Sequence, residues 1–170
     1  TVPITVAFTG AVNVTGTPQL TLNDGAVADY TSGSGTSTLT FTYTVGAGEN
    51  TADLDYASTT ALTLNGGTIK DGSGNNATLT LPATGSNGLA TANLVIDTVA
   101  PTVTVEQGSG QKDPTISDTL VFRAVFSKAV STFAAVDVTV TGFAPGTMSV
   151  NVVPIGGDGK TYDLEVTGMT

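Results

Sequence analysis

Apolar residues alternate with polar ones along much of the chain, which is the two-residue period of a β-strand with one buried face. The clearest case is STLTFTYTVG at 37–46, where Leu39, Phe41, Tyr43 and Val45 share one face. The same alternation recurs in PITVAFTG at 3–10, PQLTLNDG at 18–25, TALTLNGG at 60–67, ATLTLP at 77–82, PTVTVEQ at 101–107, VDVTVTG at 136–142 and TYDLEVTG at 161–168. The pattern therefore predicts eight short strands.

Segments rich in Gly, Asn and Asp lie between these strands, and Gly and Asn tolerate the positive φ angles of tight turns. They are NDG at 23–25, SGSG at 32–35, NGG at 65–67, DGSGNN at 71–76 and GGDGK at 156–160. Short strands at this spacing are typical of a β-sandwich or barrel. One helical turn is expected, around STFAAVD at 131–137 or GENTADLDY at 48–56.

The composition indicates an all-β fold and limits how it is stabilised. Thr and Val are abundant, and β-branched side chains favour strands. Aromatic residues make up only 6% of the chain and Trp is absent, so a core of Val, Leu and Ile with a few Phe and Tyr must suffice, which suits sheets packed in thin layers. Cys is also absent, so burial, hydrogen bonds or a bound hard cation must replace disulfides.

The residues that carry common enzyme chemistry are missing. The chain has no His, the usual general base, and no G-x-S-x-G, S-x-x-K, Walker or dinucleotide-binding pattern. Carboxylate pairs are available for glycoside hydrolysis, but few aromatic side chains are present to bind sugar rings. We predict that the protein is not an enzyme. Its net charge of -9 disfavours nucleic acid, and no apolar run approaches the length needed for membrane insertion.

The chain contains two similar stretches, which suggests an internal repeat. VAFTGAV at 6–12 matches AVFSKAV at 124–130 with an offset of 118 residues between Phe8 and Phe126. We therefore predict two copies of one domain type, at 1–98 and 99–170. The first copy is expected to lack its opening strand and the second its closing strands, because the matching segments lie at different distances from the chain ends.

The segment NLVIDTVAPTVTV at 93–105 is interpreted as the junction between the copies. Pro101 cannot donate a ladder hydrogen bond, and it keeps the preceding residue extended. Asp97 to Pro101 therefore separates two strands.

The chain resembles the bacterial immunoglobulin-like repeats of large secreted adhesins and biofilm matrix proteins. The resemblance is carried by 12–56, by LNGGTIKDGSGNNATLTLP at 64–82 and by the linker VIDTVAPTVTV, and more weakly by 117–142 and 159–170. It implies tandem Ig-like β-sandwiches at the bacterial cell surface or outside the cell.

The acidic loops suggest calcium as a cofactor. Asp71, Ser73 and Asn75 have the one-three-five oxygen spacing that opens an EF-hand loop, but Asn76 and Pro82 stand where that loop needs Gly and Glu. A true EF-hand is thus excluded, and a solvated turn is the simpler interpretation. The resemblance implies instead calcium at the domain junction, held by Asp97 with Asp71 and with Asp113 or Asp118.

A second acidic group is formed by Glu49, Asp53 and Asp55. It could hold another cation, but alternate Asp residues flanking Leu54 on a strand are more typical of a solvated face.

The expected function is therefore that of a structural module, an adhesin stalk stiffened by calcium. Its partners would be neighbouring repeats or other copies of itself. Two alternatives stay open: a matrix fibre subunit completed by strand donation between chains, which would explain the missing strands, and a ligand-binding adhesin tip. The sequence names no adhesive target.

Overall fold

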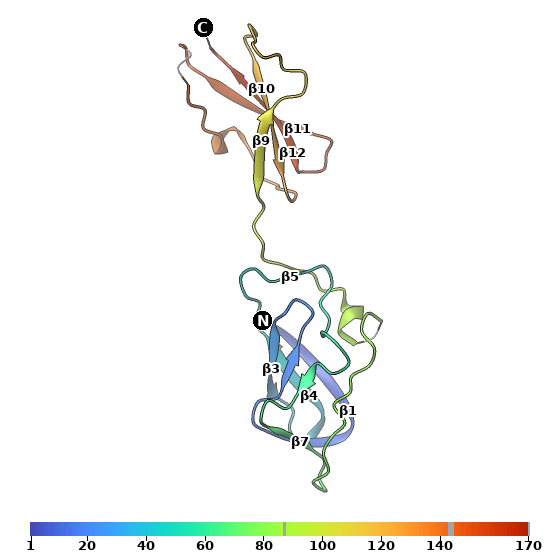
Figure 1. Ribbon diagram of the computed structural model, residues 1–170. Helices are drawn as coiled ribbons and strands as arrows, with labels where there is room; N and C mark the ends of the chain where they lie inside the picture. Colours follow the sequence, from blue (N-terminus) through green and yellow to red (C-terminus); the bar gives the residue numbers. More distant parts are fainter. Residues whose placement is uncertain (87, 143–144, 170) are drawn as a thin grey trace. The chain divides into compact units, whose positions relative to one another are not determined.

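A computed structural model describes residues 1–86, 88–142 and 145–169, and within them the protein is nearly all-β with antiparallel pairing (Figure 1). The chain divides into two compact units, Thr1–Val99 (unit 1) and Ala100–Thr170 (unit 2). That the two are Ig-like repeats stays a prediction.

Unit 1 is built around a six-stranded sheet with the order β6-β2-β3-β4-β1-β7. Its strands are β1 (Val2–Thr15), β2 (Gln19–Thr21), β3 (Val27–Ser32), β4 (Thr36–Tyr43), β6 (Leu62–Thr63) and β7 (Thr68–Lys70). A short pair, β5 (Asn50–Thr51) with β8 (Ile96–Asp97), and the 3-10 helix η1 (Gly88–Ala92) complete the unit.

The core of unit 1 follows from the alternation along β4. Leu39, Phe41 and Tyr43 are fully buried, and the threonines between them face the other way. Opposite them on β1, Ile4 pairs with Phe41 and Val6 with Leu39, so the inward faces of the two strands coincide. The period-two prediction for this strand is confirmed, because its inward face is buried from Leu39 to Tyr43.

Unit 2 has one sheet of four strands in the order β11-β12-β10-β9 among its described residues. The strands are β9 (Val103–Gln107), β10 (Leu120–Phe126), β11 (Ser149–Ile155) and β12 (Thr161–Thr167). Ala124, Tyr162, Leu164 and Val166 are buried on one face, where Phe133 packs edge-on against Phe126 and Tyr162.

Two segments with strand-like alternation are not strands, so these predictions are wrong. Residues 77–82 are irregular, and Leu81 donates its amide N–H to Thr59 instead of a ladder. At 136–142 the chain forms the 3-10 helix η2 (Ala135–Asp137) and then runs irregularly, leaving Val136 almost fully exposed. The helical turn predicted around 131–137 is confirmed there, and the alternative at 48–56 is not, because β5 lies in that range.

Candidate functional site

The turn after β7 uses the Asp71 carboxylate to hold itself together. Asp71 Oδ1 accepts the backbone N–H groups of Ser73 and Asn75, each at 2.9 Å, and Oδ2 accepts the Asn75 side-chain amide at 2.8 Å. The side-chain hydrogen bond from Asn75, helped by the backbone ones, holds the pKa of Asp71 below its usual value. Asn75 therefore presents its side-chain N–H to the carboxylate, and the segment is a turn closed on Asp71.

Asp71 and Asp97 lie at opposite ends of unit 1. Asp71 follows Lys70, which pairs with Asn13 near the end of β1. Asp97 pairs with Asn50, next to Glu49, whose carboxylate reaches Tyr43 opposite the start of β1. Figure 1 shows β7 and β5 at the two ends of the unit. The structure thus does not bring Asp71 and Asp97 together, because β1 is fourteen residues long.

The other residues predicted at the junction lie on the surface of their units. Asp97 is exposed, and its Oδ1 accepts the backbone N–H of Val99 at 3.2 Å. Asp113 and Asp118 are exposed in the segment between β9 and β10. Across the described ranges, no group of three or more acidic side chains is placed to hold a metal ion.

The Asp53 and Asp55 pair differs from the predicted solvated face. Asp55 is only 6% exposed, and its carboxylate accepts the backbone N–H groups of Tyr56 (2.8 Å) and Gly85 (2.9 Å). The prediction is wrong because residues 52–55 form no strand but a loop that is folded onto the unit. Asp55 thus fixes the chain around Gly85 to the core.

A polar cluster that the sequence did not indicate lies at the end of β4. The Tyr43 hydroxyl is 2.7 Å from Asp24 Oδ2 and 2.6 Å from Glu49 Oε2. Burial, followed by the hydrogen bonds to these carboxylates, raises the pKa of Tyr43 above its usual value, so the phenol stays protonated. The one sequence signal was the inward position of Tyr43, because a buried tyrosine hydroxyl usually needs a polar partner.

Replacing Tyr43 with phenylalanine should destabilise unit 1 by about 1–3 kcal/mol, because two carboxylates lose their shared donor in a partly buried site. Urea unfolding followed by circular dichroism measures the change. Tyr30→Phe is the matched control, since the Tyr30 hydroxyl accepts the N–H of Ser34 in an exposed turn. An equal loss in both variants would contradict the role given to the cluster.

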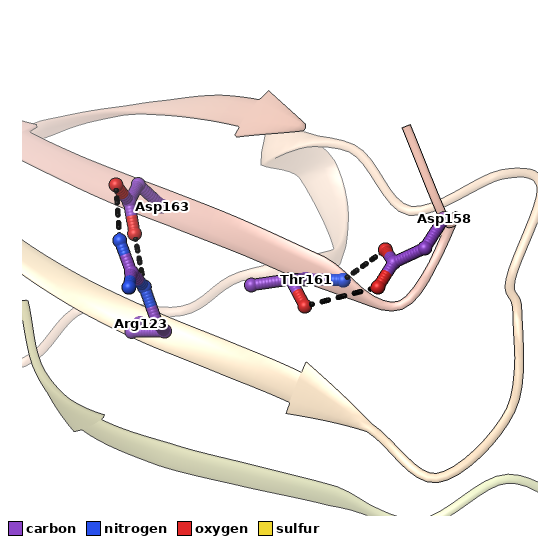
Figure 2. Close-up of polar contacts among 4 residues, drawn as sticks. All are labelled: Arg123, Asp158, Thr161 and Asp163. Atoms are coloured by element: carbon purple, nitrogen blue, oxygen red, sulfur yellow. Dashed lines mark hydrogen bonds and ion pairs between the residues drawn. The ribbon is translucent and has the colours of Figure 1, made fainter. Parts of the chain in front are cut away.

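Unit 2 contains two further charged contacts, both drawn in Figure 2. Arg123 on β10 faces Asp163 on β12 and forms two parallel hydrogen bonds, Nε to Oδ1 at 2.9 Å and Nη2 to Oδ2 at 3.0 Å. Asp158 precedes β12 and its Oδ1 accepts the backbone N–H groups of Lys160 (2.8 Å) and Thr161 (3.1 Å). These carboxylates fix strand register and a turn.

Acid should weaken unit 2 partly through Asp158. The backbone N–H of Lys160, followed by that of Thr161, lowers the pKa of Asp158 in the folded state. A lowered folded pKa gives stability that is present above the unfolded value near 4 and is lost as the pH falls through the folded pKa. Asp158→Asn should therefore flatten the fall in unfolding free energy between about pH 5 and pH 2. Asp118→Asn, at an exposed position, is the control and should keep the wild-type slope.

A groove follows the first strand of unit 1. One cavity of about 310 Å³ is lined by β1 from Ile4 to Phe8 and by the segment 78–82. A second, more open one of about 600 Å³ continues past Ala7–Val12, the Asp71 turn and residues 76–78. β1 and residues 77–82 therefore form the two walls of one groove, and the prediction of strands did not reveal it.

No protein-family model matches the chain, and no curated protein or solved structure matches it either. Among the described residues, no helix is long and apolar enough to cross a membrane. A functional proposal therefore rests on the contacts of this chain alone.

Proposed function

We propose that the chain is a non-catalytic structural module of a bacterial cell-surface or extracellular matrix protein, such as an adhesin stalk, built from tandem Ig-like sandwiches. The observation that carries the proposal is the use of its carboxylates. Asp71, Asp158 and Asp55 each accept backbone N–H groups, and Asp163 pairs with Arg123. Acidic side chains employed in this way stabilise turns and strands.

The antiparallel ladders support a mechanical role. β4 is paired with β1 on one edge and with β3 on the other, and β12 is paired along both of its edges in unit 2. Strands held between two neighbours must lose many hydrogen bonds at once before a sheet gives way. Two such units in one chain suit a spacer that is extended under load.

Single-molecule force spectroscopy tests the proposal on the whole chain held between two marker domains. We expect two unfolding events, with contour-length gains of about 330 Å for unit 1 and about 230 Å for unit 2, from roughly 3.3 Å per residue. Extension without resistance, or turnover of a polysaccharide by the purified chain, would contradict a structural role.

Calcium belongs to this proposal only at the junction. Asp97 is the candidate in unit 1, and Asp113 or Asp118 the candidates in unit 2, since carboxylate oxygens are the ligands that calcium prefers. In a calcium titration followed by NMR, we expect shifts at residues near Asp97 and none in the turn at 71–76. Asp97→Asn should abolish these shifts, whereas Asp71→Asn should keep them. Shifts confined to the 71–76 turn would contradict this assignment.

A further inference from the structure

One edge of β1 is open along most of its length. β1 pairs with β4 on one edge, and its other edge pairs with β7 only from Asn13 to Thr15. From Val2 to Val12 that second edge has no strand beside it among the described residues, and the groove lies there. An edge of this kind presents a row of backbone donors and acceptors that can pair with an added strand.

The opposite wall of the groove suits the same purpose. Residues 78–81 alternate Thr and Leu, and Leu79 and Leu81 pack partly buried against the core of unit 1. The backbone N–H groups of Ala77 and Leu81 bind Ile69 and Thr59, respectively, and not β1. A strand between the two walls would therefore meet apolar side chains below it and backbone on either side.

Unit 2 shows what fills the corresponding position. β10 pairs with β12 in the same way as β1 pairs with β4. Leu120, Phe122 and Ala124 face Val166, Leu164 and Tyr162, just as Val2, Ile4 and Val6 face Tyr43, Phe41 and Leu39. On the other edge of β10 lies β9, antiparallel, with Val103 opposite Phe126 and Val105 opposite Ala124. The edge that β9 covers in unit 2 is the edge that is open in unit 1.

We infer that the groove along β1 binds an extended strand antiparallel to β1, and that this strand is Val103–Gln107 of a second copy of the chain. The register of unit 2, transferred by the offset of 118 residues, places Val103 opposite Phe8, Val105 opposite Val6 and Gln107 opposite Ile4. This inference rests on the proposed structural role and names the partner of that role.

The exposure of β9 favours it as the donor. All five of its residues are exposed, with Val103 at 49% and Val105 at 57%, and β9 is an outer strand held on one edge by β10. Residues 108–119, which connect β9 to β10, contain no strand. Gly108 and Gln111 hydrogen-bond to Val121 on β10, so these bonds must break when β9 moves away. In the groove both valines would be covered, and both edges of the strand would lie beside backbone. Moving β9 from β10 to the β1 of a second copy therefore replaces one ladder of hydrogen bonds with another and buries more apolar surface.

The contact is heterologous, because it joins different surfaces of the two copies. Each copy would offer its groove to one neighbour and β9 to another, so association extends into rings or open fibres and does not stop at a pair. The average molar mass in solution should therefore rise continuously with protein concentration.

The test uses the full chain, by light scattering over a concentration series and by hydrogen exchange of the β1 amides. We expect masses above 16.9 kDa as concentration rises, and protection of β1 amides between Ile4 and Gly10 when a synthetic peptide of residues 101–108 is added. The same peptide should reverse the association. Val105→Lys should weaken association at least tenfold, because its ammonium would enter the groove. Thr104→Lys, on the other face of the same exposed strand, is the matched control and should have little effect.

A constant mass at millimolar concentration, peptide binding without self-association, or equal effects of the two lysine variants would overturn the inference. None of these results bears on the force experiment, so a monomer that still unfolds in two steps under load would leave the proposed function standing.

Discussion

Replacing Phe41 with alanine is expected to cost unit 1 about 3–5 kcal/mol of unfolding free energy, because the ring is fully buried and leaves a cavity that the sheet cannot fill. Phe41 lies on β4 between β1 and β3 and packs edge-on against Tyr30 at a centroid distance of 6.0 Å. Since small domains are stable by only about 5–15 kcal/mol, the variant should unfold at far lower urea concentration. Circular dichroism and the NMR signals of unit 1 measure the shift.

Phe122→Ala is the matched control for the cavity argument. Phe122 occupies the position in β10 that corresponds to Ile4 in β1, but 36% of its surface is exposed. The same change in chemistry should therefore cost unit 2 less than half as much. A loss at Phe122 as large as that at Phe41 would contradict the difference in burial between the two side chains.

The second large effect is expected at Gly33, in the turn between β3 and β4. Its φ angle is +106°, and an added Cβ would lie 2.2 Å from the carbonyl oxygen of Thr38 and 3.0 Å from Leu39 Cα. Gly33→Ala combines a left-handed backbone with a clash against backbone atoms that cannot move aside. We expect a loss of about 2–5 kcal/mol in the unfolding free energy of unit 1.

Gly35→Ala separates the two causes. Gly35 has a similar φ of +86°, but an added Cβ would meet nothing within 4 Å. This control should lose only the cost of the left-handed conformation, about 1–2 kcal/mol. Equal losses at both positions would show that the contact with Thr38 does not matter. Urea unfolding of both variants beside the wild type decides between these outcomes.

The strands that the sequence predicted correctly are those in which local and tertiary signals agree. In β4 and β12 the apolar residues alternate, and each strand lies between two neighbours and buries one face. At 77–82 and 136–142 the alternation is as regular, but the first segment forms single backbone hydrogen bonds to β7 and to a loop, and the second begins in η2. A two-residue period of apolar residues shows which side chains share a face, but it does not show whether a partner strand is present.

The candidate sites divide in the same way. The turn character of DGSGNN could be predicted, because Asp and Asn close turns through bonds to residues two to four positions away. That Asp71 and Asp97 lie far apart, that Asp55 is buried, and that Asp24 and Glu49 meet at Tyr43 could not be predicted, since each depends on how distant loops fold over the sheet.

The sequence by itself determined that this is an all-β chain, where its turns lie and which faces of its best strands point inward, because these properties follow from side-chain shape and local periodicity. Only the tertiary structure decided which edges are paired. Ladder hydrogen bonds join residues far apart in the chain, and backbone groups carry no residue-specific signal. The offset of the repeats predicted that the first copy lacks its opening strand, but only the three-dimensional structure showed the open edge of β1 and the place of β9 on the corresponding edge of β10.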